Sequence, residues 1–212
     1  MGIDMENQGV LIIFAKSPVA GQVKTRLIPS IGRVKATNLY RELLARTLDT
    51  AVKTQFTDIQ LWVSGNIRHR FFSGFKSRNN FKFYQQEGED LGQRMFNAFD
   101  SVLKKHPYAI LIGSDCPSLL NSDLKSAMTL LEDGKELVLG PAKDGGYYLI
   151  GLRKNNFKLF SEIKWGGESV FSETYSRAKK MKLDIELLSE KRDVDRASDL
   201  YSYFRMKRKE II

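Results

Sequence analysis

The sequence predicts an α/β domain in which helices cover both faces of a mostly parallel sheet. Short apolar runs of strand length alternate along the chain with segments whose apolar residues recur at helical spacing. This alternation is typical of βαβ units, and such units build a parallel sheet. The chain has 212 residues and no Pro-, Gly- or Ser-rich linker divides it, so we expect one domain, residues 1–212.

The first part of the chain supplies several strands and two long helices. The runs VLIIFA (10–15) and YAILIG (108–113) are continuously apolar, as in buried strands, and IQLWVS (59–64) and FKFYQQ (81–86) are strand-like. Apolar residues at helical spacing predict helices over 32–53 and 91–105: Ala36, Leu39, Leu43, Leu44 and Ala51 in one, and Leu91, Met95, Ala98, Phe99 and Val102 in the other.

The second part continues the alternation. Asn121 or Ser122 can cap a helix that carries Leu124, Met128 and Leu131. Strands are expected at 137–140, 147–152 and 182–188, and helices at 168–180 and 195–205. Ligands of open α/β sheets bind beyond the carboxyl ends of the strands, so the residues that follow each strand are the candidates for function.

Composition excludes several classes of protein. The longest apolar runs are too short to cross a bilayer, and MGIDMENQG carries acids and no apolar core, so we expect no signal peptide. A single cysteine allows no internal disulfide, so a cytoplasmic location is expected. The net charge of +9 suits anionic partners such as nucleotides, but the cations are dispersed and no RNA-binding signature is present, so we expect no nucleic-acid partner.

The segment KSPVAGQVKTRL (16–27) follows the first strand and contains Lys16, Lys24 and Arg26. A loop in this place can offer backbone N–H groups and charge-assisted hydrogen bonds to phosphate. It has neither the Walker pattern nor the dinucleotide fingerprint. On spacing alone, a solvated loop is an equally good interpretation.

Acidic residues follow two other expected strands. Asp115, in GSDCP, follows the 108–113 strand, where an acid can hold a divalent cation beside substrate phosphates or simply cap a turn. Asp193 and Asp195, in DVDRASDL, precede the last helix, where an aspartate is a routine N-cap. The functional alternative is that one of them supplies the metal with a second carboxylate.

Two glycine-containing loops complete the set of candidates. In GPAKDGGYY, Asp144, Gly145 and Gly146 form either a plain hairpin turn or a place where a ligand approaches bare backbone. In QEGEDLGQR, Gly88, Asp90 and Leu91 lie where a loop enters a helix and a base or sugar could pack.

Five motifs in this order resemble a known family: PVAGQVKTRL, GEDLGQRM, GSDCPSL, GPAKDGGYYLIGL and DVDRASDL. They are similar to those of a bacterial glycosyltransferase-like group, of the DUF2064 type, within the nucleotide-diphospho-sugar transferase superfamily. Some members are called arsenosugar-biosynthesis glycosyltransferases, and the layout is similar to molybdenum-cofactor and phospholactate nucleotidylyltransferases. The resemblance covers residues 9–203 and implies a GT-A-type, Rossmann-like three-layer sandwich.

The resemblance also implies a role for each candidate residue. The nucleotide and its phosphates would contact Lys16, Gly21, Lys24, Arg26, Gly88, Asp90 and Leu91. The sugar or acceptor would contact Asp144, Gly145, Gly146 and Trp165, and the catalytic groups would be Lys24, Arg26 and Asp144. Asp115 and, by position, Asp195 rather than Asp193 would bind Mg²⁺ or Mn²⁺.

The activity implied is metal-dependent transfer of a sugar from a nucleotide-diphospho-sugar to a small-molecule acceptor. One alternative is nucleotidyl transfer, in which an NTP is joined to a phosphorylated small molecule and pyrophosphate leaves. A second is a nucleotide-binding protein without turnover. The base, the sugar, the acceptor and the oligomeric state are left open by the sequence.

Overall fold

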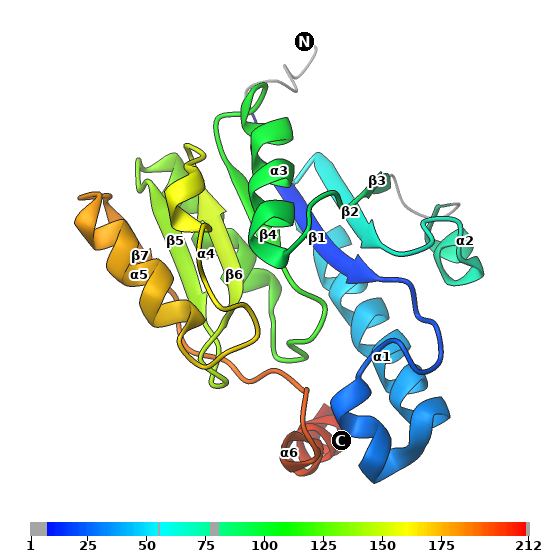
Figure 1. Cartoon of the computed structure of the whole chain (residues 1–212). Coiled ribbons are helices and arrows are strands. Elements are labelled where there is room, and N and C mark those ends of the chain that lie inside the picture. Colours follow the sequence, from blue (N-terminus) through cyan, green and yellow to red (C-terminus); the bar gives the residue numbers. More distant parts are fainter. Residues whose placement is uncertain (1–7, 55, 77–80, 211–212) are drawn as a thin grey trace.

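A computed structural model describes residues 8–54, 56–76 and 81–210 of the chain. Its centre is a seven-stranded sheet with the order β3-β2-β1-β4-β6-β5-β7 (Figure 1). Every paired strand runs parallel to its neighbour except β6, which is antiparallel to both β4 and β5. The prediction of a mostly parallel sheet in an α/β fold is confirmed.

The strands lie close to their predicted positions. They are β1 (Val10–Lys16), β2 (Asp58–Ser64), β3 (Phe81–Gln85), β4 (Ala109–Ile112), β5 (Leu137–Pro141), β6 (Tyr147–Leu152) and β7 (Ile185–Leu187). The last is shorter than expected. In the parallel register, Val10 lies opposite both Asp58 and Ala109, so β1, β2 and β4 run in step and their carboxyl ends share one edge of the sheet.

The helices are α1 (Ile28–Val52), α2 (Arg70–Lys76), α3 (Leu91–Leu103), α4 (Asn121–Glu132), α5 (Val170–Lys180) and α6 (Ala197–Glu210). Short 3-10 turns, η2 (Thr25–Leu27) and η3 (Phe157–Leu159), accompany them. The helix α1 begins before Gly32, whose φ of 77° kinks it. The expected cap at Asn121 or Ser122 is wrong, because α4 begins at Asn121 and Leu120 is its N-cap. The last helix begins at Ala197 rather than Asp195.

The helices form a layer on each face of the sheet. Leu11 and Ile13 of β1 pack in one apolar cluster with α1, α2 and α4, whereas Val10 and Ile12 pack in another with α3 and α5. The alternation follows from the period of two along a strand. Both clusters consist of fully or nearly fully buried side chains, so the sheet is covered on both sides (Figure 1).

A third, smaller cluster fixes the last helix. Leu39 and Leu43 of α1 pack with Val194 and Tyr203. The Tyr203 hydroxyl donates a hydrogen bond of 2.7 Å to Glu42, and Lys207 forms an ion pair with the same carboxylate. Helix α6 is thereby held against α1, at the bottom of Figure 1, and the segment before it crosses the edge of the sheet.

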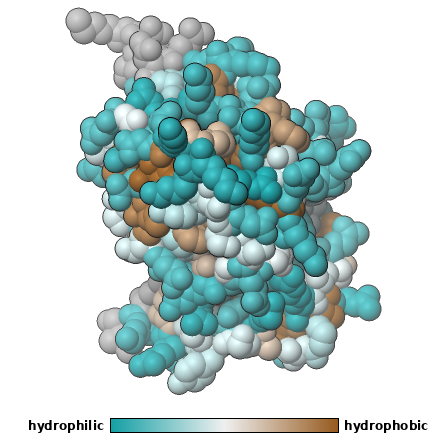
Figure 2. Space-filling view, turned by 60° about the vertical axis from the view of Figure 1, so that its left-hand side comes forward, coloured by the Kyte–Doolittle hydropathy of each residue, from teal (hydrophilic) through white to brown (hydrophobic). Residues whose placement is uncertain are grey.

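The surface is largely polar. Hydrophilic side chains cover most of the face drawn in Figure 2, and hydrophobic atoms appear there only in small separate areas. Among the described residues, no helix combines the length and the apolar character that crossing a membrane requires.

Candidate functional site

The candidate site lies at the edge of the sheet where the parallel strands end. Three neighbouring cavities open there, with volumes of about 500, 200 and 210 Å³. The first cavity lies over the ends of β1 and β4, and the second and third lie toward β5 and β6. The Arg26 side chain lines all three, so they form one continuous region around it.

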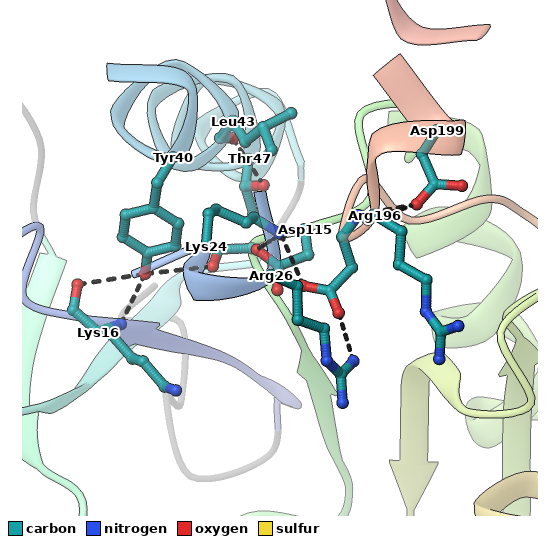
Figure 3. A network of polar contacts seen from close by, with 11 residues as sticks. Lys16, Lys24, Arg26, Tyr40, Leu43, Thr47, Asp115, Arg196 and Asp199 are labelled. Carbon is teal, nitrogen blue, oxygen red and sulfur yellow. Dashed lines mark hydrogen bonds and ion pairs between the residues drawn. The ribbon is translucent and has the colours of Figure 1, made fainter. Parts of the chain in front are cut away.

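Lys24 is buried at the centre of this region. Its backbone is left-handed, with φ 49° and ψ 42°, which few residues other than glycine adopt. The side chain is only 2% exposed, and the ammonium lies 2.8 Å from Asp115 Oδ1 and 3.8 Å from Asp195 Oδ1 (Figure 3). The contact with Asp115 is an ion pair by distance but lacks hydrogen-bond geometry.

Arg26 is the exposed cation of the same loop. Its Nη1 donates a 2.5 Å hydrogen bond to Asp195 Oδ2, while 52% of the side chain is exposed to the cavities. One edge of the guanidinium is therefore fixed by a carboxylate. The other N–H groups remain directed toward space that a ligand can fill.

The Asp193–Asp195 segment is tied to the tip of β4. The backbone N–H of Val194 donates to the carbonyl of Asp115 at 3.0 Å, which brings both aspartates beside Asp115. Asp193 Oδ1 is buried and has no hydrogen-bond partner in the described part of the chain. Burial, together with the negative charges of Asp115 and Asp144, raises the pKa of Asp193 to about 7.

Tyr40 joins the ends of β1 and β4 and was not expected at the site. Its hydroxyl accepts a 2.6 Å hydrogen bond from the Lys16 N–H and donates a 3.1 Å bond to the Lys16 carbonyl, and Ser114 Oγ lies 3.4 Å away. Burial and the charge of Asp115 raise the pKa of this phenol, so it stays neutral. The signal for it was a hydroxyl within the apolar stripe that predicted helix α1.

Gln86 and Arg94 also line the first cavity without having been singled out. Gln86 Nε2 donates to the carbonyls of Ala15 and Trp62, at 3.1 and 2.9 Å, which fixes the amide between β1 and β2. Arg94 Nε donates to the Gly88 carbonyl at 2.9 Å. Both residues belong to the segment QEGEDLGQR, which was a candidate as a loop, but only the place of β3 beside β2 shows that these two side chains reach the first cavity.

The second cavity has an aromatic wall and an acidic rim. Tyr147, Tyr148 and Trp165 line it together with Asp144 and Asp193. The Trp165 indole Nε1 is buried without a hydrogen-bond partner among the described residues, and a Cβ on Gly92 would lie 2.6 Å from it, so this edge of the ring packs against the backbone of α3. Rings flanked by carboxylates suit a compact ligand that carries hydroxyl groups.

Most of the residues expected at the site come together there. The first cavity is lined by Lys16, Lys24, Arg26, Leu91, Asp115 and Asp195, and the second by Arg26, Leu91, Asp144, Gly146 and Trp165. Four expected positions, Gly21, Gly88, Asp90 and Gly145, line none of the three cavities.

Three of those four positions have a structural function in their loops. Gly88 and Gly145 adopt φ values of 136° and 89°, and a Cβ on Gly145 would lie 2.0 Å from the Glu168 carbonyl oxygen. The Asp90 carboxylate caps α3 by accepting a 2.7 Å hydrogen bond from the Gln93 N–H. The motifs thus contain loop-forming residues as well as cavity-lining ones.

The charges of the site suit a divalent cation. Its carboxylates are Asp115, Asp144, Asp193 and Asp195, whereas Lys24 and Arg26 are the cations that pair with them. Carboxylate oxygens are the ligands that Mg²⁺ prefers, and the unpartnered Asp193 Oδ1 is one of them. In the described residues, no three His, Cys, Asp or Glu side chains are arranged to hold a metal, and the Lys24 ammonium contacts both Asp115 and Asp195.

The comparisons with known proteins agree with this architecture. Residues 47–167 match the family model of DUF2064, described as uncharacterized protein conserved in bacteria. The crystal structure of a proposed nucleotide-diphospho-sugar transferase from Desulfovibrio desulfuricans G20 is 30% identical, with a TM-score of 0.85, and the match covers 94% of this chain and 87% of that one. No curated protein matches the sequence.

Two more distant structures share the fold. The inositol-1-phosphate CTP transferase of T. maritima is 16% identical with a TM-score of 0.63, and the match covers 94% of each chain. The Rv0371c protein of Mycobacterium tuberculosis H37Rv, solved with manganese, is 16% identical with a TM-score of 0.57, covering 92% of this chain and 97% of that one. The family match and the similarity to the Desulfovibrio protein lead to one conclusion: the chain belongs to the DUF2064 family and has the nucleotide-diphospho-sugar transferase fold.

Proposed function

We propose that this protein is a metal-dependent transferase that moves a sugar from a nucleotide-diphospho-sugar to a small-molecule acceptor. The observation that carries the proposal is the position of Lys24 and Arg26. They face Asp115 and Asp195 at the junction between a cavity of about 500 Å³ and an aromatic one of about 200 Å³. The first has room for a nucleotide and the second for a sugar.

The cations would act on the leaving group. In glycosyl transfer, negative charge builds up on the departing nucleoside diphosphate. Arg26, with half of its side chain exposed, would meet that charge directly, and Lys24 would join it after leaving the carboxylates that it contacts. Groups placed in advance stabilise the transition state more than the ground state, and losing one typically costs about 10²–10³ in rate.

A divalent metal would be held by Asp115 with Asp195 or Asp193. When bound, Mg²⁺ or Mn²⁺ would supply charge neutralisation for the diphosphate oxygens. For that, the Lys24 ammonium must leave the carboxylates it contacts at 2.8 and 3.8 Å. Phosphate oxygens are the natural alternative partners for this ammonium, so nucleotide and metal would bind together.

The second cavity would hold the sugar and the acceptor. Asp144 lies on its rim with Oδ1 fixed by the Gly146 N–H at 3.0 Å, so Oδ2 is the atom able to take a proton from an acceptor hydroxyl. The Trp165 ring, which lines the same cavity, would pack against the transferred sugar. The ring and Asp144 would together hold the reacting hydroxyl next to the diphosphate end of the first cavity.

Nucleotidyl transfer is the second candidate, and the concentration of cations favours it. Lys16, Lys24, Arg26 and Arg94 all line the first cavity, which is enough positive charge for a triphosphate. In that reaction a phosphorylated small molecule attacks the α-phosphorus and pyrophosphate leaves. The two reactions would use the same residues, and their products differ.

The products decide between the candidates. The protein is incubated with Mn²⁺ and UDP-, GDP-, ADP- or CDP-sugars, or with NTPs and sugar 1-phosphates, and nucleoside diphosphate and pyrophosphate are quantified. Slow hydrolysis of one donor to nucleoside diphosphate, absent in Asp115→Asn, supports glycosyl transfer. Pyrophosphate from an NTP supports nucleotidyl transfer. If the protein binds a nucleotide tightly but forms neither product, the remaining interpretation is a nucleotide-binding protein without turnover.

A further inference from the structure

A third cavity, of about 210 Å³, continues from the second. The two share Arg26, Asp144, Gly166 and Asp193 as lining residues. The third cavity also contains three cations, Lys143, Arg192 and Arg196, to which the sequence analysis gives no role. A molecule seated against the aromatic wall of the second cavity would therefore extend past Asp144 into a compartment with several cations.

Arg196 is a cation of this compartment whose guanidinium is not paired with a carboxylate of the described residues. Its backbone N–H donates to Asp199 Oδ2 at 2.7 Å, which fixes the main chain. In Figure 3 its side chain extends away from Asp199, toward the same side as the guanidinium of Arg26. Among the described residues, the Arg196 guanidinium has neither an ion pair nor a hydrogen bond. A planar guanidinium left open in this way can bind an oxyanion through two parallel hydrogen bonds.

Lys143 adds a second weakly paired charge on the opposite wall. Its nearest carboxylate, Glu190, is 4.0 Å away, and half of the lysine side chain is exposed. It follows β5, whereas Arg196 precedes α6, so the two cations reach the cavity from different elements. The cavity is therefore positively charged on two sides.

Five carboxylates line the compartment, and three of them have partners, whereas Glu168 and Asp193 remain beside the cations. Asp195 is paired with Arg26. Asp199 accepts from two backbone N–H groups and lies 3.6 Å from Arg192. Asp144 Oδ1 accepts from Gly146. These pairings reduce the negative charge that a ligand would meet, whereas Arg196 and Lys143 keep theirs available.

On the basis of the proposed function, we propose that the third cavity binds an anionic group of the acceptor, a phosphate or a carboxylate, through Arg196 and Lys143. Gly166, which has no side chain, lies between the second and third cavities and leaves a passage from one to the other. The acceptor would then be a small molecule with a hydroxyl near Asp144 and an oxyanion near Arg196.

The test uses inorganic phosphate and acetate as probes, titrated by calorimetry at constant ionic strength into the full chain. Four proteins are compared: wild type, Arg196→Gln, Lys143→Gln and Lys16→Gln. Lys16 lines the first cavity but not the third, so its variant controls for anions that enter the nucleotide site. Phosphate against acetate separates a tetrahedral from a planar ligand, and melting temperatures confirm that each variant is folded.

We expect saturable binding of at least one probe that weakens about tenfold in Arg196→Gln, weakens less in Lys143→Gln, and stays within twofold of wild type in Lys16→Gln. Three results would overturn the inference: no saturable binding to wild type, loss only in Lys16→Gln, or equal loss in all three variants. Nucleotide sugars and NTPs are titrated into the same samples. If they bind while the probes fail, only this inference falls. If the probes bind and no nucleotide does, the proposed function falls.

Discussion

Lys24→Met is the substitution for which the structure makes the sharpest prediction. The buried ammonium lies 2.8 Å from Asp115 Oδ1 and 3.8 Å from Asp195 Oδ1, where it occupies the position that we propose for the metal cation. Removing it leaves the carboxylates without their counter-charge but open to a divalent ion. The variant should therefore bind Mn²⁺ more tightly than wild type when no nucleotide is present.

The size of the effect follows from the geometry. Two unit charges about 4 Å apart interact by about 4 kcal/mol at an effective dielectric constant near 20. Asp115 is 41% exposed and the contact lacks hydrogen-bond geometry, so the value must be reduced for solvent screening. About 1–3 kcal/mol remains, which corresponds to Mn²⁺ binding that is about 5- to 150-fold tighter.

Without metal, the Lys24→Met variant should be less stable than wild type, although its affinity for Mn²⁺ is higher. Clustered carboxylates with no partner destabilise the fold, and about 1–3 kcal/mol corresponds to a melting temperature lower by about 3–10 °C in a domain of this size. Added Mn²⁺ should restore the melting temperature of Lys24→Met to that of wild type. The measurements are calorimetric titration of Mn²⁺ and thermal unfolding with and without the metal.

Lys16→Met is the matched control, because Lys16 lines the same cavity and forms no ion pair among the described residues. It removes the same charge without freeing a carboxylate, so its Mn²⁺ affinity should stay within about twofold of wild type. If Lys24→Met binds Mn²⁺ no more tightly than Lys16→Met does, the Lys24 ammonium does not compete with a metal ion for Asp115 and Asp195, and the prediction is wrong.

Three further predictions concern turnover, the strand ends and the last helix. Asp115→Asn should lose about 10²–10³ in product formation while melting within a few degrees of wild type, and wild-type turnover in the folded variant would remove Asp115 from the mechanism. Tyr40→Phe should cost about 1 kcal/mol in denaturant unfolding, because its hydroxyl bonds the Lys16 backbone; no loss would show those bonds to be unimportant. Burial raises the pKa of Glu42, but hydrogen bonds from Lys207 and Tyr203 outweigh it and lower that pKa. Its carboxylate therefore stabilises the fold above its unfolded-state pKa and ceases to do so as the pH falls through the folded-state value. Glu42→Gln should destabilise by less than about 1 kcal/mol at pH 7, and the loss should shrink as the pH is lowered, measured by denaturant unfolding.

The central strands were predictable because a strand that is buried on both faces is a continuous run of apolar residues. The run VLIIFA and the run YAILIG contain no polar residue because each strand packs against helices on two sides. Helix α2 was not predicted. It is only seven residues long, too short for helical periodicity to be recognised, although its Phe72 is fully buried.

The pairing of Lys24 could not be predicted from its motif. The sequence places a lysine after β1 and an aspartate after β4, which favours phosphate and metal as separate partners. The left-handed backbone of Lys24 turns its side chain inward onto Asp115, and no property of one sequence indicates that direction. Gly88 and Gly145 line none of the three cavities, and their positive φ values show a requirement of loop geometry that the motifs alone did not reveal.

Joint binding of a nucleotide and a divalent metal at Asp115 underlies the proposed function. The most direct test is calorimetric titration of UDP-, GDP-, ADP- and CDP-sugars and the four NTPs, with and without Mn²⁺, into wild type and Asp115→Ala. We expect binding of one nucleotide sugar that requires Mn²⁺ and is lost in Asp115→Ala. Binding that is unchanged without metal and in the variant, or no binding of any nucleotide to the folded wild type, would contradict joint binding at Asp115.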